Sequence, residues 1–538
     1  MKTVVRLYTK YKNILFITLI AILVGLPLLH TGLMPTHDGE YHVIRFYEFY
    51  KALAAGNWYP VWAPDLNFGY GVPLFLFVYP LPNYFATLFH LFGIGFIDGL
   101  KLNMFVAGII GGIFFYLWAK EWWTNLGALV GATFYTFSPY HFLDVYVRGS
   151  VGEVWALGLF PVFLWAITKT ANERQKKYVV FSAVSLALII FAHNILALMF
   201  FFFAISYAGF LFLQTKEKKT FFLQVVGIFL LGLGLSSIFW LPALVETKYV
   251  TGLQLFEIHN NFPDLFQLLI PSWGTGFDPN DLNNQMSFQI GVMNLLAIFA
   301  SIILLPFVWK KKPVRFILLF FLGWFVLLFY LMLPVSQPVW NTLPLIHYFQ
   351  FPWRLLSLMI LVCSFVSGAI FSIKDSRILA AVIIFLAIIT TYNYSKPAYY
   401  MMRSDNHYTT RSNFIDGTNS PGNAFNTIWM TLPKKHATKL VDTDGTIGKM
   451  TGTPTHFSFT INAKTNQTVT INTTYFPGWA VKVDDITTAI KQKNGLITFP
   501  IKQGIHTVIA SFGLTFIQII AQCISLLALV ILLVKGLG

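Results

Sequence analysis

The chain has 538 residues, of which 56% are hydrophobic and 11% are charged, and its mean hydropathy is +0.64. A soluble protein carries about 25% charged residues, so this composition excludes a soluble enzyme and indicates a polytopic membrane protein. The net charge of +15 comes from short basic clusters between apolar runs, a pattern of cytoplasmic loops and not of nucleic-acid binding. Cys363 and Cys523 both lie in apolar runs, so neither a disulfide framework nor a thiolate metal site is expected.

The first apolar run, residues 14–29, follows several basic residues and precedes no small-residue cleavage site. It is therefore expected to be an uncleaved membrane span. A polar and aromatic loop over residues 31–70 comes next. Within it, apolar side chains at helical spacing between Val43 and Leu53 predict an amphipathic helix in the interface plane, with Arg45, Glu48 and Lys51 on its polar face. Gly56 is placed to end this helix.

The stretch 71–96 is apolar but is broken by Pro73, Pro80 and Pro82, which favours a re-entrant or interfacial segment. Eleven further apolar runs each approach the roughly 20 residues that cross a bilayer. They lie at 102–119, 126–142, 154–167, 179–192, 195–213, 221–245, 290–309, 316–333, 355–373, 378–391 and 512–534. With the first span they give about twelve crossings, or thirteen if 71–96 also crosses.

Basic clusters mark the cytoplasmic side of a membrane protein. Their positions put both termini in the cytoplasm, and the first loop and the segment 395–511 outside the membrane. The expected organisation is a transmembrane domain over 1–394, which includes the first outer loop at 31–70, then an extracytoplasmic β domain over 395–511 and a last membrane helix over 512–538.

Between 395 and 511 the composition changes to Thr, Asn, Lys and Asp, and apolar residues alternate with polar ones. This alternation predicts strands at 457–461, 469–471, 481–483 and 497–501. Asn494-Gly495 is a hairpin-turn signal, and Asp484-Asp485 is expected to make another turn. The expected fold class is therefore an all-α polytopic membrane protein with a small antiparallel β domain before the last helix.

Two carboxylates and two imidazoles stand within six residues just after the first span: His37, Asp38, Glu40 and His42. Charged groups are costly beside lipid and are usually kept there for a function. Asp38 and Glu40 could orient and deprotonate an acceptor hydroxyl, with or without an Mg²⁺ or Mn²⁺ ion bound to both carboxylates. Alternatively, Asp38 caps the amphipathic helix, Glu40 is a first-turn charge, and the histidines are interfacial.

Two arginines are candidate phosphate ligands at the outer ends of apolar runs. Arg148 and Glu153 flank a glycine-rich break, and Arg148 could bind a phosphate while Glu153 orients it or a sugar hydroxyl. The alternative is an Arg–Glu pair that satisfies itself at a helix end. Arg354 begins a later span, where its guanidinium could bind the phosphate of a lipid donor or extend to lipid headgroups.

Four further polar residues are weaker candidates for substrate contacts. His193 and Asn194 stand between two apolar runs, where a polar tight turn is the alternative. Glu246 begins an outer loop and can equally mark the boundary with water. His347 belongs to the aromatic outer segment that leads to Arg354.

These features resemble the GT-C superfamily, membrane glycosyltransferases that use polyprenyl-phosphate sugars and carry an Asp-x-Asp or Asp-x-Glu motif in the first outer loop. Asp38-Gly39-Glu40 matches this motif in kind and place. More closely, the chain resembles the bacterial YfhO-type family and the membrane proteins named as related to 6-pyruvoyl-tetrahydropterin synthase. The matching stretches are 37–39, 71–82, Arg148-Gly149 with Glu153, His193-Asn194, 239–242, 351–354, 476–479 with Asp484, and 504–506. No zinc-binding histidine cluster accompanies them, so the pterin-synthase name implies no pterin chemistry here.

The resemblance implies an inverting glycosyltransferase that moves a sugar from a polyprenyl-phosphate donor to an extracytoplasmic glycan, lipid or protein. Asp38 would take the proton of the acceptor hydroxyl, and Arg148, Arg354 or a metal ion would meet the charge on the leaving phosphate. The lipid tail would enter near residues 71–96. A glycolipid transporter or flippase, or a non-catalytic cell-envelope protein, is the alternative. Transporters place ionisable groups near the bilayer midplane, whereas here they gather at the outer ends of the apolar runs.

Overall fold

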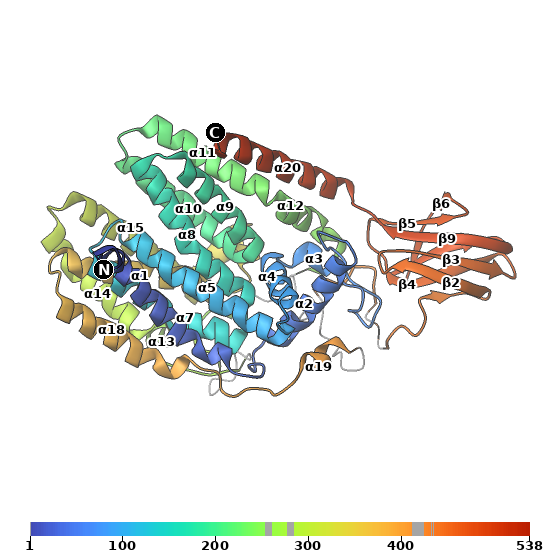
Figure 1. The fold of residues 1–538 in the computed structure, drawn as a ribbon, viewed down its shortest axis with the longest axis horizontal. Coiled ribbons are helices and arrows are strands. Elements are labelled where there is room, and N and C mark those ends of the chain that lie inside the picture. The colour runs from blue at the N-terminus through green and yellow to red at the C-terminus, as the bar shows by residue number, and fades with distance from the viewer. Residues whose placement is uncertain are drawn as a thin grey trace.

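The computed structural model describes residues 2–252, 261–276, 285–410, 424–431, 433 and 435–537. A long helical body occupies one end of the molecule and an antiparallel β domain occupies the other (Figure 1). Both chain ends lie in the helical body, away from the β domain (Figure 1). The expected fold class, a helical membrane protein with a small antiparallel sheet domain before the last helix, is confirmed.

The helices follow one another in chain order, with short connections through most of the body. They are α1 (Lys2–Gly25), α2 (Gly39–Ala54), α3 (Leu74–Phe77), α4 (Leu81–Leu91), α5 (Phe96–Ala119), α6 (Asn125–Thr136), α7 (Pro139–Phe142), the π-helical turn η2 (Leu143–Arg148), α8 (Val151–Glu173), α9 (Lys176–Ala192), α10 (Asn194–Gln214), α11 (Lys218–Leu235), α12 (Ser237–Glu246), α13 (Leu265–Leu269), α14 (Val292–Val308), α15 (Lys312–Met332), α16 (Gln337–Thr342), α17 (Leu356–Val366), α18 (Arg377–Thr391), α19 (Asp405–Thr409) and α20 (Phe516–Leu537).

Nine helical segments in the described ranges are long and apolar enough to cross a membrane. They are Tyr11–Leu29, α5, α8, α10, α11, α15, Pro352–Ser372, Arg377–Tyr394 and Phe516–Val534. Two shorter helices, α9 and α14, have 17 residues each. With these two helices the described residues offer eleven crossings. The twelfth expected crossing, 126–142, forms α6, which has twelve residues, and α7, which has four, and α6 at about 18 Å is too short for about 30 Å of hydrocarbon.

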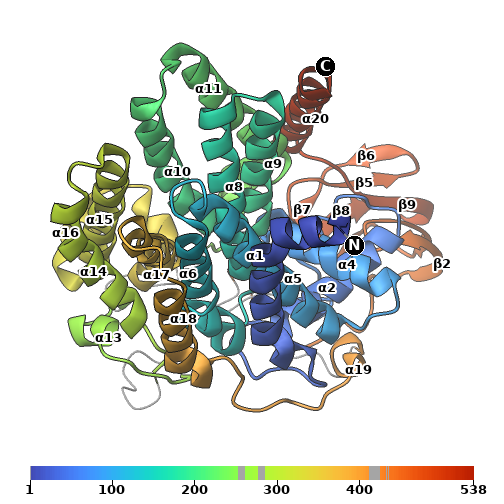
Figure 2. The same ribbon diagram turned by 60° about the vertical axis from the view of Figure 1, so that its left-hand side comes forward.

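The centre of the helical body is α8, which is almost entirely buried and stands beside α9 and α10 in Figure 2. Helices in a membrane pack closely where their contact residues are small. Gly158 of α8 meets α5 in this way, because a Cβ there would lie only 2.6 Å from the carbonyl oxygen of Ala107. The close contact fixes α8, and with it the outer end of the helix, against α5.

The proline-broken stretch 71–96 does not form a long helix. It contains α3, which has four residues, and α4, which has eleven and is about 16 Å long. Neither can cross about 30 Å of hydrocarbon. The short helices agree with the prediction of a re-entrant or interfacial segment. Phe49 of the first loop packs against Phe75 of α3 and Tyr84 of α4, so the connection between these two helices lies next to the first loop.

The predicted amphipathic helix is α2, and Gly56 follows it with a φ of +88°. The face predicted to be polar is not exposed to water, because Arg45 and Glu48 are both buried. The Glu48 carboxylate accepts the backbone N–H of Asp65 at 3.1 Å and lies 3.7 Å from Lys51 Nζ. Burial raises the pKa of Glu48 well above its ordinary value. The helix is therefore enclosed by its own loop.

The β domain contains two antiparallel sheets. Their strands are β1 (Val441–Asp442), β2 (Thr446–Thr453), β3 (His456–Ala463), β4 (Gln467–Thr474), β5 (Trp479–Val483), β6 (Ile486–Thr488), β7 (Lys491–Lys493), β8 (Leu496–Ile501) and β9 (Gly504–Phe512). The sheet orders are β1-β4-β8-β7 and β2-β3-β9-β5-β6. Apolar residues of both sheets share one core. The four predicted strands are β3, β4, β5 and β8, and both predicted turns adopt positive φ angles, 52° and 77° at Asn494-Gly495 and 50° and 63° at Asp484-Asp485.

The β domain is fastened to the second half of the first loop. Trp62 belongs to the core of the β domain, and its ring lies 5.6 Å from that of Trp479 and 5.3 Å from that of Phe512. The backbone N–H of Thr474 donates to the carbonyl of Tyr70 at 2.8 Å. The domain therefore contacts the first loop directly and is not a separate appendage.

We expect Trp62→Ala to lower the free energy of unfolding by about 3–5 kcal/mol, because it removes a large buried side chain from the contact between loop and β domain. Trp58→Ala is the matched control, since Trp58 lies in the same loop but is 65% exposed. Its effect should stay within about 0.5 kcal/mol. Denaturation in detergent measures both variants, and equal effects would contradict the described docking.

Candidate functional site

The first loop is bonded to the backbone just before α8. The N–H groups of His37 and Asp38 donate to the carbonyl oxygens of Val147 and Arg148 at 2.9 and 2.8 Å. Gly149 follows with a φ of +68°, and a Cβ at this position would lie 2.3 Å from the hydroxyl oxygen of Thr36. Only glycine allows this approach without displacing the loop. The structure thus brings Asp38 next to Arg148, two residues that are far apart in sequence.

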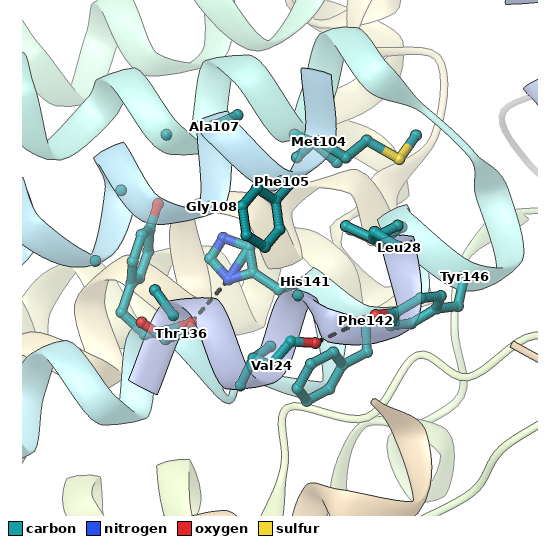
Figure 3. Close-up of a pocket in the computed structure, with 18 residues that line it drawn as sticks. Val24, Leu28, Met104, Phe105, Ala107, Gly108, Thr136, His141, Phe142 and Tyr146 are labelled. Atoms are coloured by element: carbon teal, nitrogen blue, oxygen red, sulfur yellow. Dashed lines mark hydrogen bonds between the residues drawn. The ribbon is translucent and has the colours of Figure 1, made fainter. Parts of the chain in front are cut away.

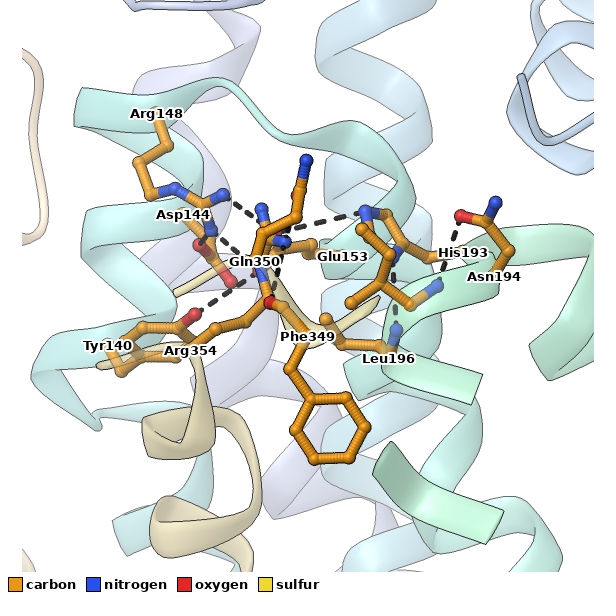
Figure 4. A network of polar contacts seen from close by, with 11 residues as sticks. Tyr140, Asp144, Arg148, Glu153, His193, Asn194, Leu196, Phe349, Gln350 and Arg354 are labelled. Carbon is orange, nitrogen blue, oxygen red and sulfur yellow. Dashed lines mark hydrogen bonds and ion pairs between the residues drawn. The ribbon is translucent and has the colours of Figure 1, made fainter. Parts of the chain in front are cut away.

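Arg148 is buried and bonded to two carboxylates. Its Nη1 lies 2.5 Å from Asp144 Oδ1 and 2.6 Å from Glu153 Oε2, and its Nη2 donates to Glu153 Oε1 at 2.7 Å (Figure 4). The guanidinium also lies over the ring of Trp353, 4.8 Å from its centroid. Both terminal nitrogens of Arg148 therefore have protein partners already.

Arg354 reaches the same carboxylate from the other side. Its Nε lies 3.0 Å from Glu153 Oε1, and its Nη1 donates to the carbonyl of Phe349 at 3.3 Å and to the side chain of Gln350. Its second terminal nitrogen, Nη2, makes no hydrogen bond to any of the described residues. Of the two candidate phosphate ligands, Arg354 is thus the one with a terminal nitrogen that has no hydrogen-bond partner among the described residues.

Glu153 is the centre of this cluster, which we call the Glu153 cluster: Tyr140, Asp144, Arg148, Glu153, His193 and Arg354. The Tyr140 hydroxyl donates to Glu153 at 3.2 Å, and His193 Nε2 lies 3.8 Å from Glu153 (Figure 4). Two guanidiniums and two carboxylates balance in charge. Such a buried set is stable only while its members remain paired.

A second group of side chains surrounds Asp38 on the loop side. Asp38 is half-buried and interacts electrostatically with the buried guanidinium of Arg45 and with the hydroxyl of Tyr79. Burial and the nearby Arg45 lower the pKa of His42 well below its ordinary value, so this imidazole is neutral at pH 7. The Tyr79 hydroxyl also interacts electrostatically with Glu153 and Arg148. The Tyr79 ring contacts His42 of α2 on one side and His193 of the Glu153 cluster on the other.

Glu40 faces a different part of the chain. It forms an ion pair with Arg403 and accepts the Tyr408 hydroxyl at 2.7 Å. Residues 399–410 form a strap along the first loop, and Asp405 in it accepts the N–H groups of Phe96 and Ile97 at the start of α5, at 2.6 and 3.1 Å. The strap thereby ties the beginning of α2 to the beginning of α5.

Asp38 and Glu40 are the predicted ligands of a divalent ion in the first loop. Mg²⁺ and Mn²⁺ take several oxygen ligands. Across the described ranges, no three His, Cys, Asp or Glu side chains gather where they could bind one ion. The pairing of Glu40 with Arg403 also competes with a cation bound between Asp38 and Glu40. An ion bound to both carboxylates, with water or a substrate phosphate as further ligands, therefore requires Glu40 to leave Arg403, and this site stays a prediction.

The weaker candidates for substrate contacts, His37, His193 and Asn194, hydrogen-bond to backbone groups of the protein. His37 Nε2 lies 2.8 Å from the carbonyl oxygen of Thr275. His193 and Asn194 accept N–H groups at the start of α10, from Leu196 at 3.2 Å and from Ile195 at 3.0 Å (Figure 4). These bonds fit the predicted tight turn, and His193 contacts the Glu153 cluster as well.

Glu246 does not face the Glu153 cluster. It is buried, accepts the side chain of Gln518 at 2.8 Å and that of Thr515, and so connects α12 to the start of α20. A tertiary contact of this kind has no local signal in the sequence. The side chain of His347 lies outside the described residues.

An apolar cavity of about 60 Å³ lies between α1, α5 and the α6–α8 region (Figure 3). Gly108, Gly111 and Gly112 of α5 form part of its wall, and His141, whose Nδ1 lies 2.7 Å from the Tyr135 carbonyl oxygen, points into it. It is not lined by residues of the stretch 71–96, where the lipid tail was expected to enter.

Sequence reasoning missed Asp144, Arg45 and Tyr79. Asp144 precedes Arg148 by four residues, a spacing that brings side chains together on a helix and could have revealed the pair. Arg45 lies seven residues after Asp38, two turns along the same face of α2. Tyr79 gives no local signal, because only the folding of residues 71–91 against the first loop brings it to the site.

Comparison with known proteins places these residues in a family. Residues 76–399 match the model of a family described as "6-pyruvoyl-tetrahydropterin synthase related domain; membrane protein". The chain belongs to this family. The matched region contains Arg148, Glu153 and Arg354, begins after Asp38 and ends before the β domain.

Individual relatives are more distant. An uncharacterized protein of Lactococcus lactis subsp. cremoris (strain MG1363) is 24% identical over 247 residues, which are 44% of this chain and 40% of that protein. Two solved structures are 14% identical and cover 72% of this chain. The arabinofuranosyltransferase AftD from Mycobacteria has a TM-score of 0.47 with 26% of its chain covered, and the apo oligosaccharyltransferase of Archaeoglobus fulgidus has a TM-score of 0.41 with 56% covered. This chain thus spans less than two thirds of each of these proteins.

We expect Glu153→Gln to lower the free energy of unfolding by about 3–5 kcal/mol, because two buried guanidiniums lose the carboxylate they share. Glu173→Gln at the exposed end of the same helix is the control, because its pair with Lys169 is open to water and should contribute little to stability. Thermal denaturation in detergent compares them. An equally small effect of both would show that Glu153 is not the centre of the cluster.

Proposed function

We propose that this protein is a membrane glycosyltransferase that moves a sugar from a polyprenyl-phosphate donor to an extracytoplasmic acceptor, with inversion at the anomeric carbon. The observation that carries the proposal is the meeting of Asp38 with the Glu153 cluster. The backbone N–H of Asp38 donates to the carbonyl of Arg148, whose guanidinium shares Glu153 with that of Arg354, and Arg354 Nη2 has no hydrogen-bond partner among the described residues. A base beside a phosphate ligand is what a single-displacement transfer needs.

Asp38 is the proposed base. It would accept the proton of the acceptor hydroxyl while the acceptor oxygen forms its bond to the anomeric carbon. The bond from that carbon to the phosphate oxygen breaks in the same step, and the polyprenyl phosphate leaves with the electron pair. The buried Arg45 guanidinium, which interacts electrostatically with Asp38, places a fixed positive charge beside this carboxylate.

Arg354 is the proposed ligand of the leaving phosphate, through Nη2. Arg148 would contribute mainly through its charge, because both its terminal nitrogens are bonded to Asp144 and Glu153. Fixed positive charges near a developing phosphate charge act without reorganising during the reaction. Glu40 would be a positioning residue, since its pairing with Arg403 fixes the start of α2, where Asp38 is located.

The proposed orientation follows from the same arrangement. The first loop and the β domain touch each other, so they lie on one side of the membrane, and both chain ends lie away from the β domain (Figure 1). With the basic clusters in the cytoplasm, the site and the β domain face outward. The acceptor would then be a glycan, lipid or protein of the cell envelope, and the protein would reside in the cell membrane.

We expect Asp38→Asn to lower the consumption of a labelled polyprenyl-phosphate sugar at least about 100-fold, because the acceptor proton then has no base. The assay uses membranes that contain the protein, so that they supply both the enzyme and the acceptor. It measures the polyprenyl phosphate that is released. Asp485→Asn is the control, because it changes an exposed turn of the β domain at a positive φ that asparagine also adopts.

Two results would refute the proposal. One is full turnover by a stably inserted Asp38→Asn protein. The other is a wild-type protein that moves the labelled lipid between leaflets without cleaving it, which is the behaviour of a transporter.

A further inference from the structure

Tyr79 occupies an unusual position between the two halves of the site. It lies in the short connection between α3 and α4, just before Pro80. Its carbonyl oxygen accepts the side-chain amide of the buried Asn83 at 2.9 Å, which fixes the backbone at this point. The residue is therefore presented to the site by a rigid break in the chain and not by a flexible loop.

The ring of Tyr79 fits into a narrow slot. The His193 ring lies 5.0 Å from it and the His42 ring 6.1 Å from it, measured between centroids. Gly152 forms the floor, because a Cβ there would lie 2.4 Å from ring atoms Cε2 and Cζ of Tyr79. The three neighbours come from α2, α8 and the α9–α10 turn, so the ring position depends on the assembled site.

The hydroxyl of Tyr79 makes no hydrogen bond to any described residue, although it lies among charges. Asp38 and Arg45 act on it from the loop side, and Glu153 and Arg148 act on it from the cluster side. Burial raises its pKa above the ordinary value, so at neutral pH it carries its proton. It is thus a neutral donor near the proposed base, Asp38, and near Arg148 and Glu153 of the Glu153 cluster.

We propose that the Tyr79 hydroxyl donates a hydrogen bond to the phosphate of the polyprenyl-phosphate donor as that phosphate leaves. The inference rests on the glycosyl transfer proposed above and adds a neutral hydrogen-bond donor to the one that Arg354 Nη2 would supply. The bond strengthens as the anomeric C–O bond breaks, because the phosphate then gains negative charge. Tyr79 keeps its proton throughout, and the acceptor proton still goes to Asp38.

Tyr79→Phe removes the hydroxyl and keeps the ring that packs on Gly152, His42 and His193. We expect kcat for donor consumption to fall at least about tenfold while KM for the donor changes less than about threefold, because the lost bond acts mainly in the transition state. Tyr84→Phe is the matched control. Tyr84 lies on the neighbouring α4, and its hydroxyl donates to the carbonyl of Trp58 at 2.7 Å, away from the charged groups.

The affinity for polyprenyl phosphate tests the proposed hydrogen bond of Tyr79 without relying on turnover. Polyprenyl phosphate, the expected product, carries the full charge that Tyr79 would meet. Its affinity for the protein in nanodiscs should fall about tenfold in Tyr79→Phe and stay unchanged in Tyr84→Phe. A Tyr79→Phe protein with kcat and product affinity within twofold of an active wild type would overturn this inference alone. A wild type that consumes no donor would overturn the proposed function, and this inference with it.

Discussion

The ion pairs of Glu153 with Arg148 and Arg354 determine how the helices are arranged at the end of the helical body that contacts the first loop. The two arginines come from the η2 turn and from the beginning of the Pro352–Ser372 segment, and Glu153 lies in the first turn of α8. Charges taken out of water cost several kcal/mol each unless they are paired. Folding therefore has to bring these three segments together, and in doing so it creates the anchor for the first loop at Arg148 and Gly149.

The first loop is constrained from three directions. Its start is hydrogen-bonded to the η2 turn, Glu40 is paired with Arg403 of the strap, and Trp62 is packed into the core of the β domain. Groups that stabilise a transition state are effective when they are already in place before the reaction. The β domain thus has a structural part in the site although none of its side chains belongs to the Glu153 cluster.

Local signals in the sequence predicted local structure well. Helical spacing predicted α2, and the alternation of apolar and polar residues predicted β3, β4, β5 and β8. Asn494-Gly495 and Asp484-Asp485 predicted the two turns, and the prolines predicted the break between α3 and α4. The predicted exposure of the polar face of α2 was wrong, because the rest of the first loop covers Arg45 and Glu48. Periodicity shows that two faces differ, but not what packs against each of them.

The sequence left two interpretations of Arg148 and Glu153 open: a phosphate site, or an Arg–Glu pair that satisfies itself. The two residues do pair with each other. The same Glu153 also contacts Arg354, whose Nη2 has no hydrogen-bond partner among the described residues. The sequence offered no way to see that one carboxylate serves two guanidiniums some two hundred positions apart. Such an arrangement depends on which helix ends meet, and that is a property of the whole fold.

The central claim is that Asp38 and Arg354 face one substrate position. An experimental structure in lipid nanodiscs with bound polyprenyl phosphate tests it most directly. We predict the phosphate within hydrogen-bond distance of Arg354 Nη2, with the Asp38 carboxylate beside it on the aqueous side. A phosphate bound elsewhere on the helical body, with protein side chains filling the space between Asp38 and Arg354, would contradict the account.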